Sequence, residues 1–186
     1  GVDQEAELTI SLEDAYVGGK KTVTLTTLEQ GPAGRQERGT RSYQVTIPKG
    51  VTDGRRLRLS GQGGATQSGG SAGDLYLTIR IADHPRFSVD GKNLEVTVPV
   101  TPWEAALGST VQVPLVQGSA EIKLPAGIES DKRIRIKGKG LGNEQSGRGD
   151  LFARIRITVP EKLSPKEREL FEELAKVSSF RPRERS

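Results

Sequence analysis

The sequence predicts a mainly β protein: two tandem β-sandwich domains of similar topology, followed by a short C-terminal helix. One segment occurs twice, as VTIPKGVTDGRRLRLSGQGG and as IKLPAGIESDKRIRIKGKGL, and each copy is followed by a strand that begins GDL. The repeat is close to domain size and longer than most solenoid units. Strands are short and evenly spaced, and a helix signature occurs only near the end. We therefore expect domains at 1–83 and 84–160, with the helix and a basic tail at 161–186.

The first half alternates apolar and polar residues, which predicts half-buried strands. Residues 6–12 alternate in this way, and residues 22–26 are rich in threonine and valine, which favour strands. EDAYVGG lies between them and predicts a helical turn closed by Gly18 and Gly19. The polar segment 29–39 predicts a loop. Further strands are expected at 43–47, 56–59 and 75–81.

The second half repeats this order. PWEAALG is the counterpart of the first helical turn. Strands this short, with turn residues between them, favour sandwiches over alternating strand–helix units. The expected strands lie at 94–100, 111–115, 122–124, 134–136 and 151–157.

The C-terminal segment predicts a helix. Ser164-Pro165-Lys166-Glu167 is a capping box with proline at the first helical position. Leu170, Phe171, Leu174 and Val177 then fall on one helix face. Because an isolated helix of about 12 residues is marginal in water, this face must be buried on the second domain or on another chain.

Composition excludes several function classes. The 186 residues include no cysteine, which excludes disulfides and cysteine-based zinc sites and fits a reducing, cytoplasmic location. No apolar stretch approaches the roughly 18 residues of a transmembrane helix, so no membrane association is expected. The net charge is +4, but basic and acidic residues are interleaved and only 4% are aromatic. A solvated surface is therefore favoured over a nucleic-acid interface.

Catalytic residues are scarce, and neither an enzyme nor a cofactor or metal site is expected. His84 is the single histidine and has no cysteine or second histidine to work with, which favours a role in a turn. Asp74 and Asp150 hold equivalent places before strands in the two copies, which indicates hydrogen bonding at turns.

Peptide binding is better supported. Ala6 and Leu8 on one strand, with Val23 and Leu25 on the next, would form a shallow apolar groove if both rows faced outward. Such a groove beside a free sheet edge accepts an extended peptide as an added strand. The competing interpretation is that these residues are plain core. Lys20-Lys21 is either a solvated pair or a site for an acidic peptide tail.

The motifs along almost the whole chain resemble the C-terminal half of J-domain co-chaperones, the DnaJ family. They are SLEDAYVGGKKTVTL, the first repeat, HPRF with DGKNL, VPVTPWEAALG, the second repeat and GRGDLFARIRITVP. With no cysteine, and only a short loop around 28–41 where zinc-binding members carry their insertion, the chain resembles the zinc-free class B, CbpA-like type. The HPD motif of the J-domain is absent from it, and a J-domain is expected upstream.

The resemblance implies a stress-response co-chaperone fragment that binds unfolded client polypeptide, dimerises, and delivers client to a DnaK-type heat-shock chaperone of seventy kilodaltons. Phe87 would close the client groove formed by the two apolar rows. Lys20 and Lys21 would contact the chaperone's acidic tail. The dimer contact would come from Leu170, Phe171 and Leu174. The alternative is a basic β-sandwich module that binds DNA or another polyanion.

Overall fold

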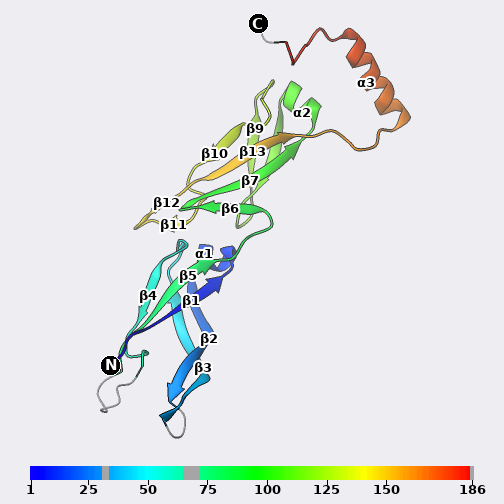
Figure 1. The fold of residues 1–186 in the computed structure, drawn as a ribbon. Helices are drawn as coiled ribbons and strands as arrows, with labels where there is room; N and C mark the ends of the chain where they lie inside the picture. The colour runs from blue at the N-terminus through cyan, green and yellow to red at the C-terminus, as the bar shows by residue number, and fades with distance from the viewer. Residues whose placement is uncertain (31–33, 65–71, 185–186) are drawn as a thin grey trace.

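The computed structural model describes residues 1–30, 34–64 and 72–184. Two β units follow one another along an elongated molecule, and a single helix stands beyond the second (Figure 1). The predicted fold class is therefore confirmed. Within the described ranges, no helix is long and apolar enough to span a membrane.

The first sandwich has two layers. One is a three-stranded sheet of order β1-β5-β4, in which β1 runs parallel to β5 and β4 antiparallel to it. The other is the antiparallel hairpin β2-β3, and helix α1 connects β1 to β2. The elements are β1 (Gln4–Ile10), α1 (Leu12–Val17), β2 (Gly19–Gln30), β3 (Gln36–Ile47), β4 (Arg56–Leu59) and β5 (Leu75–Ile81).

The second sandwich repeats this plan with additions. Strand β7 runs parallel to β13 as β1 does to β5, and α2 leads into the hairpin β8-β9. Strand β6 is added beside β7, which gives the sheet order β10-β13-β7-β6. The elements are β6 (Phe87–Asp90), β7 (Asn93–Val100), α2 (Pro102–Leu107), β8 (Ser109–Pro114), β9 (Ser119–Leu124), β10 (Arg133–Ile136), β11 (Gly142–Asn143), β12 (Gly147–Arg148) and β13 (Leu151–Ile157).

Two predictions about elements need correction. The loop expected at 29–39 is wrong at both ends, because β2 runs to Gln30 and β3 begins at Gln36. The backbone ladder of an antiparallel ribbon continues there without needing apolar side chains. Strands β6, β11 and β12 were not predicted. Strands β11 and β12 have two residues each, too few to show a period, and β6 begins in the HPRF segment that was interpreted as a turn.

The two aspartates of the repeat hold equivalent turns together. Asp74 accepts the Gly61 backbone N–H at 2.9 Å and pairs with Arg58 at 2.7 Å. Asp150 accepts the Gly138 backbone N–H at 2.8 Å and pairs with Arg135 at 2.8 Å. The Gly61 N–H, followed by Arg58, lowers the pKa of Asp74. The predicted turn role of these carboxylates is confirmed.

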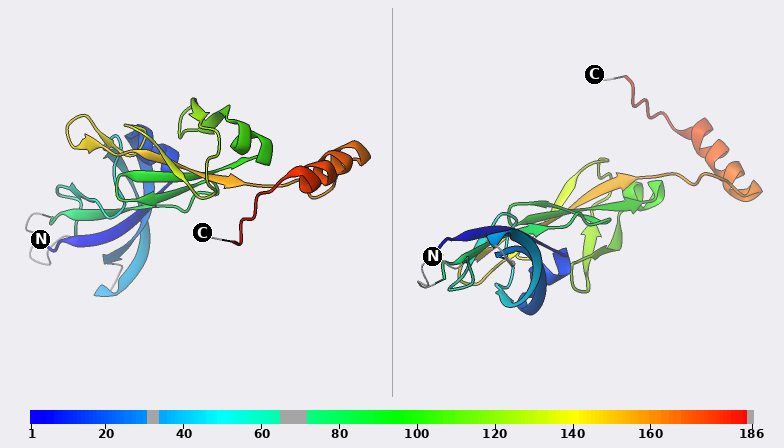
Figure 2. Two further views of the ribbon diagram at one scale, coloured as in Figure 1. Left: turned by 90° about the horizontal axis from the view of Figure 1, so that it is seen from above. Right: turned by 60° about the horizontal axis from the view of Figure 1, so that its bottom comes forward.

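The terminal helix α3 (Pro165–Val177) has the predicted capping box, with Ser164 as N-cap and Glu167 as its partner. No residue of α3 is buried, and Leu170 and Leu174 are 52% and 58% exposed. The helix stands away from the sheets in all three ribbon views (Figures 1 and 2). The second sandwich therefore leaves the apolar face of α3 largely uncovered.

Candidate functional site

The predicted groove residues lie on the inner faces of β1 and β2. Ala6 and Leu8 are half-buried and alternate with exposed residues, in phase with buried Ile10. On β2, Val23 is only 8% exposed and Leu25 is half-buried. All four pack against the hydrophobic core. Both rows therefore face the core, as the competing interpretation had it, and are only partly accessible at Ala6, Leu8 and Leu25; that they bind client stays a prediction.

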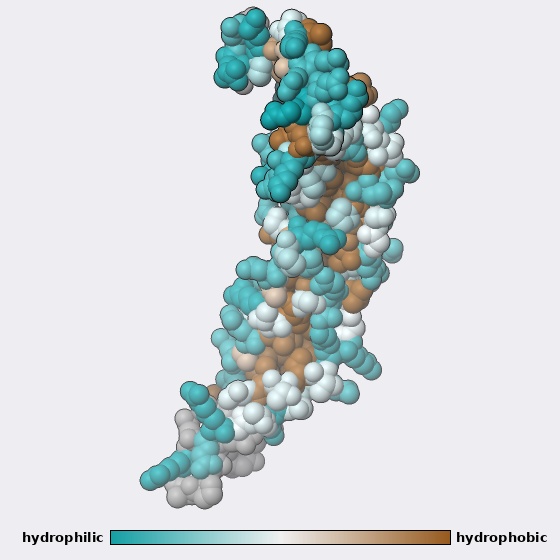
Figure 3. All heavy atoms as spheres, turned by 90° about the vertical axis from the view of Figure 1, so that its right-hand side faces the viewer, coloured by the Kyte–Doolittle hydropathy of each residue, from teal (hydrophilic) through white to brown (hydrophobic). Residues whose placement is uncertain are grey.

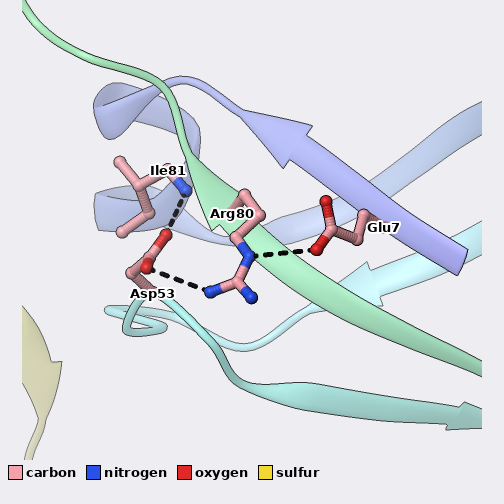
Figure 4. A network of polar contacts seen from close by, with 4 residues as sticks. All are labelled: Glu7, Asp53, Arg80 and Ile81. Atoms are coloured by element: carbon pink, nitrogen blue, oxygen red, sulfur yellow. Dashed lines mark hydrogen bonds and ion pairs between the residues drawn. The ribbon is translucent and has the colours of Figure 1, made fainter.

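The outer face of the same sheet is polar. Arg80 lies between Glu7 at 3.3 Å and Asp53 at 3.4 Å, and Asp53 also accepts the Ile81 backbone N–H at 2.8 Å (Figure 4). Next to this network, Arg56 pairs with Glu5 at 2.6 Å. Because Glu5 and Glu7 point outward, the residues that alternate with them point inward, toward the hairpin β2-β3.

The margin between β1 and β2 is open in the first sandwich. Among the described residues, β1 is paired with β5 alone and β2 with β3 alone, so each strand keeps one free backbone edge. Figure 3 shows hydrophobic residues in a strip that runs along both sandwiches between hydrophilic margins. An edge of unpaired N–H and C=O groups beside apolar side chains is the arrangement that accepts an added strand.

The second sandwich is closed at the equivalent place. The two copies can be aligned on the N-caps of α1 and α2, which are Ser11 and Thr101. In this alignment Val96 and Val98 correspond to Ala6 and Leu8, and both valines are buried. The edge of β7 that corresponds to the free edge of β1 is paired with β6. In the described structure the outer edge of β1 is therefore free and that of its counterpart β7 is covered, whereas β8, like β2, is paired with one strand only.

Phe87 belongs to a different sheet from the two rows. It is buried on β6, opposite Val96, in the sheet of the second sandwich. Its ring meets His84 edge-on, with centroids 5.1 Å apart. That Phe87 closes the groove stays a prediction.

His84 organises the junction between the sandwiches. Its Nδ1 accepts the backbone N–H groups of Arg86 at 3.0 Å and Phe87 at 3.3 Å, so the proton of the neutral ring is on Nε2. Nε2 donates to Glu13 on α1 at 2.7 Å. The pKa of Glu13 is lowered by its own backbone N–H and then by this bond. The predicted turn role of His84 is confirmed.

The two predicted tail-binding lysines differ. The Lys21 ammonium pairs with Asp14 of α1, and this bond lowers the pKa of Asp14. The exposed Lys20 has no side-chain partner in the described part of the chain. Of the pair, Lys20 is therefore the ammonium that a partner can reach without breaking an existing ion pair.

Tyr43 is a polar group that the sequence did not single out. It faces Val23 across the hairpin, is 7% exposed, and its hydroxyl has no hydrogen-bond partner among the described residues. It lines a hollow on the β3–β4 side of the sandwich, with Arg58, Ser60 and Gln62. The sequence signal that could have indicated its burial is the strand alternation, in which Tyr43 stands between the exposed residues Ser42 and Gln44.

Comparison with known proteins gives a family match over nearly the whole chain. The family model described as the DnaJ C terminal domain matches residues 4–160. A "Curved DNA-binding protein" of Serratia proteamaculans (strain 568) is 44% identical over 186 residues, which cover 98% of this chain and 60% of the relative. Proteins of the same name from Pseudomonas putida (strain W619) and Coxiella burnetii (strain Dugway 5J108-111) are 42% and 39% identical, over 98% of this chain and 58% of each relative. The chain thus spans about three fifths of the length of these relatives.

The arrangement is suited to binding. It offers an apolar margin, a free strand edge and an exposed ammonium beside it. The described residues contain no group of three or more histidine, cysteine or acidic side chains that could hold a metal ion.

Proposed function

The chain belongs to the DnaJ C-terminal domain family, and from this premise we propose that it is the client-binding and dimerising part of a J-domain co-chaperone. The observation that carries the proposal is the difference between the two copies: β1 has a free edge where its counterpart β7 is covered by β6. The duplicated fold supplies the scaffold, and the open margin of the first copy supplies the binding site. No chemical step is involved.

Client binding would follow from strand addition at this margin. An unfolded segment would bond to the free edge of β1 or β2 and place alternate apolar side chains against Ala6, Leu8 and Leu25, with Val23 beneath. Each buried anchor contributes about 1.5–3 kcal/mol before ordering costs. The net affinity of one site would then be about micromolar or weaker.

Dimerisation would offset this weak affinity. The exposed apolar face of α3 would pack on a second copy of the chain, through Leu170, Phe171 and Leu174. Two tethered grooves on one client raise avidity without new contacts. Delivery would use the acidic tail of a DnaK-type heat-shock chaperone, which Lys20 would receive, with Lys21 available once its bond to Asp14 opens.

A double substitution tests the groove. Leu8→Asp with Leu25→Asp changes two half-buried residues and spares buried Val23, so the fold should persist. Anisotropy of a labelled, permanently unfolded polypeptide should show binding to the parent chain and at least about tenfold weaker binding to the variant. If the folded variant binds the unfolded polypeptide as tightly as the parent chain does, the groove is not the client-binding site.

A second function, DNA binding, is favoured by the name that the relatives carry. Against it, several arginines on the outer faces of both sandwiches are paired with carboxylates, as Arg80 is with Glu7 and Arg154 with Glu95. DNA binding predicts an affinity for a DNA duplex that falls steeply with salt. The groove substitutions would leave that affinity unchanged.

A further inference from the structure

A hollow lies where the two sandwiches meet, outside the groove. It has a volume of about 580 Å³ and draws its lining from both halves of the chain. The first sandwich contributes the end of α1 and the turn after β3, and the second contributes the β8–β9 turn, the loop after β10 and β12. The side chains that line it include Tyr16, Val17, Lys49, Gln117, Lys139 and Arg148.

The hollow is cationic and its charges are not neutralised. Lys49, Lys139 and Arg148 come from three separate segments and converge on it. Elsewhere on the sandwiches, arginines such as Arg58 and Arg135 pair with carboxylates at less than 3 Å. For these three cations, the described ranges contain neither an ion pair nor a side-chain hydrogen bond. Like charges gathered in one hollow repel each other, and an anion would relieve that repulsion.

The joint that forms the hollow is held by backbone contacts. The Gly142 N–H donates to the Gly50 carbonyl oxygen at 2.8 Å, and Asn143 donates from Nδ2 to the Lys49 carbonyl oxygen at 3.0 Å. The Lys49 side chain takes no part in these bonds. The joint therefore holds the backbone of Lys49 in place and leaves its ammonium free to bind.

We infer that this hollow binds an acidic peptide segment, whose carboxylates pair with Lys49, Lys139 and Arg148. Arginine takes a carboxylate in a bidentate fork, and the lysines act as point charges beside it. The end of α1 adds an apolar wall, because Val17 is 46% exposed next to Tyr16. Acidic side chains interspersed with aliphatic ones match such a lining.

A nucleic-acid duplex fits the hollow less well. Duplex binding relies on many phosphate contacts spread along an extended basic face. Here three cations line one hollow, and Arg56, Arg80 and Arg154 on the outer faces already have carboxylate partners. Because both sandwiches contribute cations, a bound acidic segment would also bridge them.

Hexaglutamate, labelled with fluorescein, is the probe for the test. The parent chain should bind it saturably, and the Lys139→Ala/Arg148→Ala variant should bind it at least about tenfold more weakly. Lys49→Ala, on the other sandwich, should weaken binding in the same direction. The matched control is Lys123→Ala/Lys132→Ala, which removes two exposed lysines of the second sandwich that do not line the hollow.

The outcomes are distinct. The proposal is supported if the Lys139→Ala/Arg148→Ala and Lys49→Ala variants bind hexaglutamate more weakly while the control variant binds it as the parent does. Equal loss in the control would mean that net charge alone attracts the peptide, which overturns it. A DNA duplex that binds in a manner dependent on Lys139 and Arg148, while hexaglutamate does not bind, would also overturn it and would assign the hollow to nucleic acid. The Leu8→Asp/Leu25→Asp variant should bind hexaglutamate as the parent does, so failure of the groove proposal would not affect this result.

Discussion

Gly50 and Gly142 join the two sandwiches backbone to backbone. The Gly142 N–H donates to the Gly50 carbonyl oxygen at 2.8 Å, and a Cβ added to Gly50 would lie 1.8 Å from the Gly142 carbonyl oxygen. Gly50 also has a φ of +71°, which side chains disfavour. The contact therefore requires glycine for two independent reasons, and it fixes one sandwich against the other.

Gly50→Ala should destabilise the protein more than a matched glycine replacement does. Gly91 also has a positive φ, +59°, but a Cβ there meets nothing within 4 Å. Gly91→Ala should therefore lower the free energy of unfolding only by the cost of placing a side chain at positive φ, about 1–2 kcal/mol. Gly50→Ala should cost about 1–3 kcal/mol more, because the backbone must move apart. Urea denaturation of both variants measures the difference, and equal midpoints would show that the contact is dispensable.

Removal of residues 164–186 should yield a monomer. The apolar face of α3 is exposed on the single chain, so its burial in a dimer is the expected source of association. Light scattering measures the mass of the parent and the truncated chain at the same concentration. A truncated chain that remains dimeric would place the interface on the sandwiches instead.

Lys20→Glu should weaken the binding of an acidic tail peptide more than Lys21→Ala does. Lys20 is exposed, whereas the Lys21 ammonium is held by Asp14. A reversed charge changes attraction into repulsion, so a loss of about tenfold is expected for Lys20→Glu at low salt. Isothermal titration with the tail peptide measures this. Lys123→Glu is the control for net charge, and an equal loss there would contradict a specific contact.

Acid should destabilise the second sandwich through Glu95. Arg154, which donates to Glu95 at 3.1 and 3.2 Å, is the main cause of its lowered pKa, and Arg133 adds to it. Because the folded carboxyl has a lower pKa than the unfolded one, the unfolded state takes up the proton first as pH falls. The stabilisation that the ionised Glu95 carboxylate gives the folded state is present at neutral pH and is lost below about pH 4.

Glu95→Gln should remove this part of the acid sensitivity. Because all three side chains are partly exposed, solvent screening limits the expected loss at pH 7 to about 1 kcal/mol. Urea denaturation at a series of pH values should show that the free energies of unfolding of the parent chain and of Glu95→Gln converge as pH falls below about 4. Curves that stay parallel down to pH 3 would mean that Glu95 is not the group responsible.

Local signals in the sequence predicted much of the fold. The repeat, the alternation of β5 and β13 and the capping box of Ser164 all depend on residues close together in the chain, and the structure confirms them. The parallel pairing of β1 with β5 was not predicted, because it joins residues some seventy positions apart. The added strand β6 was missed because it begins directly after His84 in a segment interpreted as a turn.

The site was predicted less completely, for geometric reasons. Alternation shows that Ala6 and Leu8 share one face of a strand, but it does not say which face the second layer covers. The pairing of Lys21 with Asp14 depends on how α1 returns beside β2. The cationic hollow collects Lys49, Lys139 and Arg148 from segments that only the joint between the sandwiches brings together.

The central claim is that the open margin of the first sandwich, and not its closed counterpart, binds unfolded polypeptide. Leu25 and Leu115 test it most directly, since they lie equally far along the chain from the N-caps Ser11 and Thr101 and both are half-buried. Aggregation of a chemically denatured client should be suppressed by the parent chain and by Leu115→Asp, but not by Leu25→Asp. Equal suppression by the two folded variants, or equal loss in both, would contradict the account.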